Sequence, residues 1–128
     1  LTLTYKKSKI GIATDLGIAT NLVKQSLKNC DLLYIESNHD PEMLINGPYP
    51  WPLKQRIKGR SGHLSNQDAK QLIAELKTER LKHIILAHMS EENNCPEKAV
   101  KEVSGALTGT SVALHVAGPH EPGSFIRI

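Results

Sequence analysis

The hydrophobic positions along the chain fall into short apolar runs separated by stretches with helical spacing. Residues 1–5 and 9–14 alternate apolar and polar positions around a short polar turn, which predicts two strands joined as a hairpin. Residues 30–35 and 82–88 are nearly continuous apolar runs, as is typical of strands that are buried on both faces. Two further strands are predicted near the C-terminus, at residues 111–117 and 124–128.

Amphipathic stretches between these runs predict helices. The clearest one covers residues 64–77, where Ser65 is a good N-cap for a helix. Its apolar stripe consists of Ala69, Leu72, Ile73 and Leu76. Helices are also predicted at residues 20–28 and 96–107, whereas the Gly- and Pro-rich residues 41–62 predict a loop with a turn or two of helix near residues 53–58. Strands that alternate with helices predict an α/β layered fold with functional groups at the strand ends.

Length and composition predict one ordinary globular domain. The 128 residues are enough for a modest core. No apolar run approaches the roughly 18–20 residues of a membrane span, and no signal-peptide pattern is present, so no membrane partner is expected. Cys30 and Cys95 are too few for a disulfide framework, which favours a reduced, cytoplasmic setting. The net charge of +3 is mild, so nucleic-acid binding would need a local cluster of basic residues.

Polar side chains follow several of the predicted strands. Asp15 ends the second strand, Glu36 and His39 follow the third, and His88 ends the strand after the long helix. His63 lies in the turn that precedes this helix. If the strands are neighbours, these groups converge on one edge of the sheet. Mixed carboxylate and imidazole groups predict a zinc or manganese site, where a metal-bound water is the usual hydrolytic nucleophile.

Each of these residues also has a structural interpretation. An aspartate before Leu-Gly commonly serves local turn chemistry, as Asp15 could. His88 could be a hydrogen-bonded structural histidine, and His63 could simply lead into the helix cap. The remaining histidines are interpreted as structural or exposed: His83, His115 and His120.

A basic set lies in the Gly- and Pro-rich segment beside Trp51. It consists of Lys54, Arg56, Lys58 and Arg60. Such a set is most often a solvated surface, but next to an aromatic residue it could contact phosphates while the ring stacks on a base. The residues by themselves therefore indicate an α/β domain, with a metal-dependent hydrolase as one interpretation.

Six short segments between about residues 10 and 100 carry an ordered set of motifs. They are residues 14–17 (TDLG), 36–40 (ESNHD), 47–50 (GPYP), 53–57 (LKQRI), 62–66 (GHLSN) and 86–90 (LAHMS). In order and spacing they resemble the C-terminal half of a metallo-β-lactamase-fold hydrolase of the bacterial YycJ/WalJ-type subfamily, which is related to the tRNA 3′-processing endonuclease and a cyclic phosphodiesterase. The resemblance implies that residues 1–128 form a single domain, half of a four-layer αβ/βα sandwich, with a mixed sheet and helices packed on one face. It also implies a phosphodiesterase or nuclease with two divalent metals, zinc or manganese.

The resemblance also assigns roles by position. Asp15 resembles the aspartate that bridges the two metals, and His88 resembles the last histidine ligand of the second metal. His63 resembles the histidine beside the scissile phosphate that stabilises its charge or assists proton transfer. Glu36 would shape the rim without binding a metal. The candidate substrate-binding residues are Asn38, His39, Lys54, Arg56 and Arg60.

One family motif is missing from the sequence. The His-x-His-x-Asp-His motif that supplies most of the metal ligands does not occur. The chain also starts at Leu1, inside an alternating strand pattern, where a natural start usually has some slack. We therefore expect a fragment that is inactive alone, with an incomplete or empty metal site, whose partner is the missing N-terminal half of the fold.

Two other functions stay open at this point. A non-enzymatic α/β module could bury its exposed sheet by forming a homodimer. A thioester or lactam hydrolase could use the same fold, because this fold hosts many chemistries. Within the enzyme class, the basic segment and the GHLS motif favour a phosphodiester or nucleic-acid substrate over a thioester or lactam.

Overall fold

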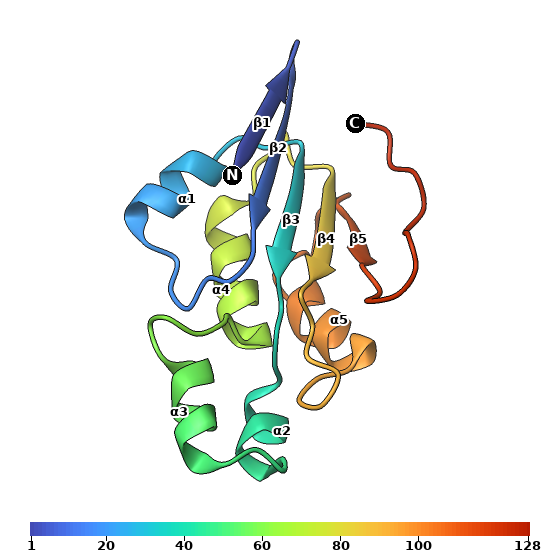
Figure 1. Cartoon of the computed structure of the whole chain (residues 1–128). Coiled ribbons are helices and arrows are strands. Elements are labelled where there is room, and N and C mark those ends of the chain that lie inside the picture. The colour runs from blue at the N-terminus through green and yellow to red at the C-terminus, as the bar shows by residue number, and fades with distance from the viewer.

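A five-stranded mixed sheet forms the centre of the computed structural model, which describes all 128 residues (Figure 1). The strand order follows the chain: β1 (Thr2–Tyr5), β2 (Ser8–Ala13), β3 (Leu32–Glu36), β4 (His83–Ala87) and β5 (Ala113–Val116). β1 and β2 form an antiparallel hairpin, and β2 to β5 run parallel to one another. Parallel neighbours need a crossover connection, and here helices provide it. The predicted α/β layered fold with a mixed sheet is confirmed.

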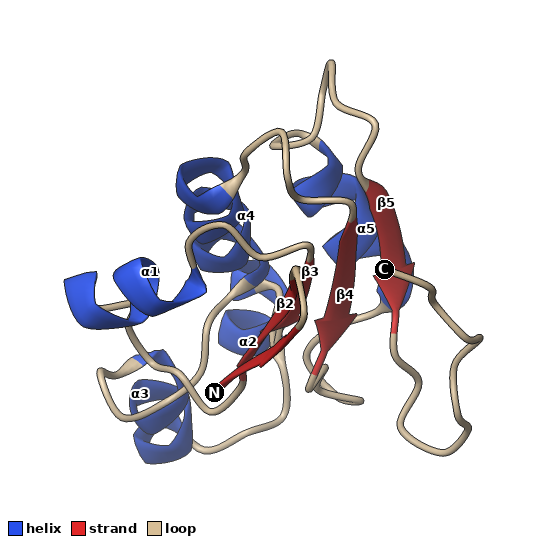
Figure 2. Ribbon diagram, turned by 90° about the horizontal axis from the view of Figure 1, so that it is seen from above, coloured by secondary structure: helices blue, strands red, loops and turns tan.

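Three helices cover one face of this sheet: α1 (Asn21–Leu27), α4 (Asn66–Leu76) and α5 (Pro96–Ser104) (Figure 2). α4 begins at Ser65 because the Ser65 side chain accepts from the backbone N–H of Asp68, while Asp68 accepts in return from the N–H of Ser65. Its predicted stripe is buried against the sheet and α5. Each such buried aliphatic side chain contributes about 1.5–3 kcal/mol to stability. None of the helices combines the length and the apolar character needed to cross a bilayer.

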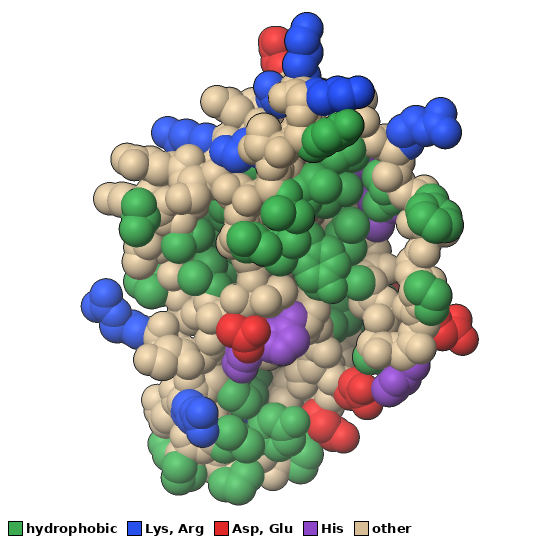
Figure 3. Space-filling view, turned by 45° about the horizontal axis from the view of Figure 1, so that its top comes forward, with side chains coloured by type: hydrophobic (Ala, Val, Ile, Leu, Met, Phe, Trp, Pro, Cys, Tyr) green, Lys and Arg blue, Asp and Glu red, His purple; other side chains and the backbone are tan.

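The opposite face of the sheet has no helix over it. Ile12, Tyr34 and Ile85 are register partners on adjacent strands, so their side chains share this face, and all three are only half-buried. His83 and His115 extend the same face toward β5, with 3.3 Å between their nearest ring nitrogens. Figure 3 shows hydrophobic side chains gathered across this surface. The fold therefore leaves an apolar layer uncovered on one side.

The Gly- and Pro-rich segment is more ordered than the sequence predicted. It contains two helices, α2 (Pro41–Asn46) and α3 (Trp51–Lys58). α2 begins where the Asp40 carboxylate accepts from the N–H of Met43, 2.9 Å away, with proline in the first turn. In α3 the prolines likewise occupy the start of the helix, where no intrahelical N–H is required.

The predicted final strand is wrong. Residues 124–128 form no strand and lie in an extended C-terminal tail (Figure 1). Phe125, the aromatic residue of this tail, is fully exposed and contacts no core. An alternating pattern becomes a strand only where a neighbouring strand can pair with it.

Asp31 ties together three segments at the start of β3, the end of the sheet opposite to Asp15 and His88. Its Oδ2 accepts from the backbone N–H of Lys9 at 2.8 Å and from Arg80 Nη2 at 2.8 Å. The Arg80 hydrogen bond lowers the pKa of the Asp31 carboxyl below its ordinary value of 3.8. A carboxyl with a depressed folded-state pKa adds stability that is complete above its unfolded pKa and is lost as the pH falls through the folded pKa.

Asp31→Asn should therefore lower the free energy of unfolding by about 1–2 kcal/mol at pH 7, because a buried charge-assisted contact is lost. The difference from the wild type should shrink as the pH falls below about 4, because the unfolded carboxyl becomes protonated there and the folded carboxyl follows only at its lowered pKa. Urea unfolding at pH 7 and pH 3 measures both values. An equal difference at the two pH values would show that the charge of Asp31 is not what stabilises the fold.

Candidate active site

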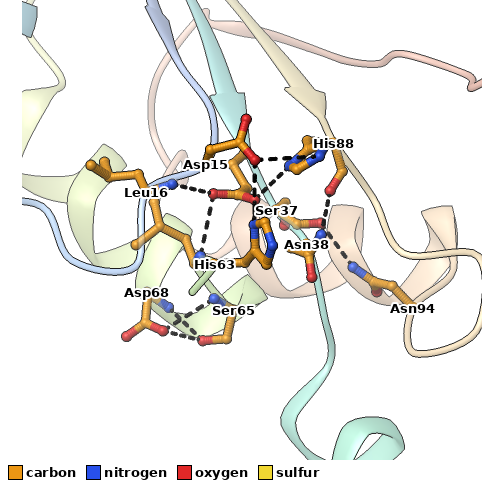
Figure 4. A network of polar contacts seen from close by, with 11 residues as sticks. Asp15, Leu16, Ser37, Asn38, His63, Ser65, Asp68, His88 and Asn94 are labelled. Carbon is orange, nitrogen blue, oxygen red and sulfur yellow. Dashed lines mark hydrogen bonds and ion pairs between the residues drawn. The ribbon is translucent and has the colours of Figure 1, made fainter. Parts of the chain in front are cut away.

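Asp15, His63 and His88 meet at the edge of the sheet where the parallel strands end (Figure 4). Asp15 follows β2, His63 precedes α4, and His88 follows β4. Asp15 Oδ1 lies 3.8 Å from His88 Nε2 and 4.0 Å from His63 Nδ1, and the two imidazole ring centroids are 5.1 Å apart. One ligand-type atom from each residue lies within 4.8 Å of the other two. The structure thus brings together the three residues that the sequence singled out.

Two of these three residues have a left-handed backbone. Asp15 has φ of 54° and His88 has φ of 51°. For residues other than glycine this conformation costs about 1–2 kcal/mol. At His88 it is held by the side-chain amide of Asn38, which donates to the His88 carbonyl at 2.7 Å. Such strain at both positions turns the chain abruptly after each strand and is typical of functional sites.

Glu36 lies beneath the two histidines and contacts both. Its Oε1 accepts from the Nδ1–H of His63 and from the Nδ1–H of His88, each at 2.7 Å. Its Oε2 accepts from the backbone N–H of Leu16 at 2.9 Å, and at 3.4 Å from that of Leu64. With both Nδ1 atoms acting as donors, the Nε2 atom of each ring is free to bind a metal or a substrate.

The sequence placed Glu36 on the rim, and the structure corrects this. Its side chain is 0% exposed, at the end of β3 and in register with Ala87, the residue before His88. The sequence did contain a sign of this role, because Glu36 ends a continuous apolar strand. Burying a carboxylate there costs free energy unless partner groups bind it, so partners were to be expected. Identifying those partners required the register between β3 and β4.

A second buried network joins the segments that carry the site. The hydroxyl of Ser37 donates to Asn66 Oδ1 at 2.6 Å, and the amide of Asn66 donates to Asn94 Oδ1 at 2.9 Å. Asn94 in turn donates to the Ser37 carbonyl at 2.9 Å. These contacts join the end of β3, the start of α4 and the loop before α5. The backbone around Glu36, His63 and His88 is thereby held by hydrogen bonds between segments far apart in the sequence.

Three of the predicted substrate-binding residues are buried. Asn38 is 9% exposed and bound to the His88 carbonyl, and Lys54 is 9% exposed with its Nζ 2.7 Å from the Ile45 carbonyl and 2.8 Å from that of Gly47. His39 is 3% exposed, and its burial lowers the pKa of the imidazole. The structure therefore does not place these three on a substrate-facing surface, because each is enclosed by the fold. Arg56 and Arg60 are exposed, as the prediction requires.

Comparison with known proteins places this site within a fold class. The chain superimposes on the metallo-beta-lactamase fold protein YhfI from Bacillus subtilis with a TM-score of 0.55 and 19% identity, covering 86% of this chain and 37% of that one. The arrangement of strands and helices is thus that of a metallo-β-lactamase-fold protein. No family model matches the sequence.

Two sequence relatives identify the chain more closely. It is 38% identical over 120 residues to "Exodeoxyribonuclease YycJ" from Bacillus anthracis, and the matched region covers 89% of this chain and 46% of the relative. It is 38% identical over 109 residues to "Exodeoxyribonuclease WalJ" from Streptococcus pneumoniae, and the matched region covers 82% of this chain and 40% of the relative. The chain is a homologue of these proteins named YycJ and WalJ, as the sequence motifs indicated. It spans less than half the length of these curated relatives.

The residues present fit the divalent metal that this family implies. One carboxylate and two imidazoles form a donor set suited to zinc or manganese. The shared contact of both Nδ1 atoms with a buried carboxylate is the usual support for histidines that bind metal through the other nitrogen. Both rings contact Glu36 at the same distance, and the different roles predicted for His63 and His88 rest on the family resemblance.

Proposed function

We propose that this chain is part of a metal-dependent phosphodiesterase that acts on nucleic acid. The observation that carries the proposal is the cluster of Asp15, His63 and His88 over the buried Glu36 carboxylate. The two relatives named as exodeoxyribonucleases support it, since they match most of this chain. The exposed basic side chain of Arg56, which lines a pocket together with Asp15 and His63, also favours a phosphate-containing substrate over a lactam or thioester.

In this proposal each side chain of the cluster has a separate role. Asp15 and His88 hold divalent metal, zinc or manganese, which when bound activates water and polarises the phosphoryl oxygens. His63 acts in its imidazolium form, protonated on both nitrogens: its Nε2–H faces the reacting phosphate and either stabilises the phosphate charge or passes that proton to the leaving oxygen. Glu36 accepts from Nδ1–H of both rings and holds their orientation, so that neither ring needs to rotate during the reaction.

We propose that the remainder of a longer protein completes both the site and the fold, with this chain as its C-terminal half. Three ligand groups are too few for two metals, and the half-buried face around Tyr34 has no covering layer. A large exposed apolar face normally marks an interaction surface. Below, "the complete protein" means this chain together with that remainder. A homodimer through the same face is the non-enzymatic alternative.

The test is hydrolysis by the complete protein of a single-stranded oligodeoxynucleotide with zinc or manganese added. We expect cleavage with metal and none after chelation. Light scattering on this chain alone distinguishes the alternatives, because a stable dimer without cleavage by the complete protein would favour the interaction module. Cleavage of a thioester or lactam but not of phosphodiesters would instead assign the protein to a different hydrolase class.

A further inference from the structure

A pocket opens beside the candidate site, between it and α3. Its volume is about 250 Å³, and its walls include Asp15 and His63 from the site together with Leu53, Arg56 and Ile57 from α3. The three α3 residues are spaced i, i+3 and i+4, so they form one side of the helix. The pocket is smaller than the roughly 300–1,000 Å³ of sites that enclose a whole small-molecule ligand. Its size suits part of a nucleotide that continues from the reacting phosphate.

The helix that forms this wall is held firmly against the site. Lys54, on another side of α3, donates to the two carbonyls at the end of α2. The backbone N–H of His63 donates to the carbonyl of Ile57 at 2.9 Å. At Gly62 a Cβ atom would lie only 2.0 Å from the Ile57 carbonyl oxygen, and at Gly17 it would lie 2.4 Å from that of Arg60. The end of α3 is therefore packed directly against the turns that carry His63 and Asp15.

Arg56 is the cationic residue of the pocket wall. It forms no ion pair and no side-chain hydrogen bond, unlike Lys54, whose ammonium donates to two carbonyls. Ser61 also lines this pocket. A guanidinium presents paired N–H donors that match two oxygens of a phosphate, and a hydroxyl can donate a further hydrogen bond. The apolar surfaces of Leu53 and Ile57 suit the sugar that links one phosphate to the next.

We infer that this pocket binds the nucleotide adjacent to the cleaved bond, with Arg56 contacting the neighbouring phosphate rather than the reacting one. The inference rests on the proposed function and extends it. It implies that the protein prefers a nucleic-acid strand with at least two successive phosphates over an isolated phosphodiester. Arg56 is a substrate-positioning residue, whereas the side chain of Lys54 stabilises the wall.

The test compares two substrates of the complete protein: an oligodeoxythymidylate and bis(p-nitrophenyl) phosphate, which has no neighbouring phosphate. Arg56→Ala should lower kcat/KM on the oligonucleotide by about 10- to 100-fold, mainly through KM, because a charge-assisted contact is lost. It should leave hydrolysis of the small diester within about twofold of the wild type, and Arg56→Lys should restore part of the loss. Lys58→Ala is the matched control, since Lys58 is an exposed cation of the same helix that does not line the pocket.

Several results would overturn the inference. Equal losses on both substrates would place Arg56 at the reacting phosphate or in the fold, and equal effects of Arg56→Ala and Lys58→Ala would reduce its role to general electrostatic attraction. If the wild-type protein cleaves neither substrate, the proposed function fails. The pocket is then tested by fluorescence anisotropy with a labelled trithymidylate in the presence of EDTA. There, Arg56→Ala must still weaken binding at least about tenfold more than Lys58→Ala does, or the inference fails too.

Discussion

Replacing Asp15 with asparagine, or His88 with alanine, should lower phosphodiester hydrolysis by the complete protein by at least about 10³-fold. Bound metal supplies several kcal/mol of transition-state stabilisation, and each 1.36 kcal/mol corresponds to a factor of ten in rate. Asn keeps the size of Asp15 but loses the negative charge that attracts a cation. The measurement is kcat/KM together with the metal content of the purified protein. Both values should fall in both variants.

The matched control is His120→Ala. The His120 side chain is 80% exposed in the C-terminal tail, where its Nε2 lies 3.5 Å from a carboxylate oxygen of Glu91, on the surface. Its removal should change neither the rate nor the metal content. A variant of Asp15 or His88 that loses its activity but keeps all of its metal would contradict the ligand assignment for that residue, because the loss would then have another cause.

The parts of the fold that depend on local periodicity could be predicted from the sequence. α4 is the clearest case, because its N-cap and its apolar stripe both lie within a dozen residues of sequence. The convergence of Asp15 and His88 could also be predicted, since parallel strands place their carboxyl ends at one edge of the sheet. In both cases, the information lies in the spacing of a few residues and in a general property of the fold class.

The features that depend on contacts between distant segments could not be predicted in the same way. Lys54 looked like a phosphate-binding cation, because its segment was predicted as a loop, and a loop does not show that two carbonyls at the end of α2 would turn toward its ammonium. Glu36 looked like a rim residue, because its two imidazole partners are 27 and 52 residues away along the chain. Both side chains are polar groups that the fold buries, and burial depends on which segments meet in space.

The family motifs recovered some of this distant information. His63 was singled out by its position in the GHLSN segment, and the structure places it in contact with the same carboxylate as His88. The resemblance also assigned His63 a role different from that of His88. The hydrogen bonds to Glu36 do not show this difference, because they are the same for both histidines. The two roles can be separated by experiment.

His63→Ala should lower kcat of the complete protein by about 10²- to 10⁴-fold while leaving its metal content unchanged. This is the usual contribution of a positioned group that transfers a proton in the transition state. Added imidazole should restore part of the activity, because it can occupy the space left by the side chain. Loss of metal from the His63→Ala protein would contradict the prediction and would instead make His63 a ligand, which its place within 4.8 Å of the other two groups allows geometrically.

Glu36→Gln provides the comparison that separates these two outcomes. The amide keeps the shape of Glu36 but loses its charge, so it holds the two Nδ1–H donors more weakly than the carboxylate at 2.7 Å does. Loss of such a supporting group typically lowers metal affinity or activity by about 10- to 100-fold. We therefore expect Glu36→Gln to weaken both metal affinity and rate, and His63→Ala to lower the rate alone. If Glu36→Gln changes neither quantity, the buried carboxylate does not orient the two histidines for the reaction, and its contacts serve only the fold.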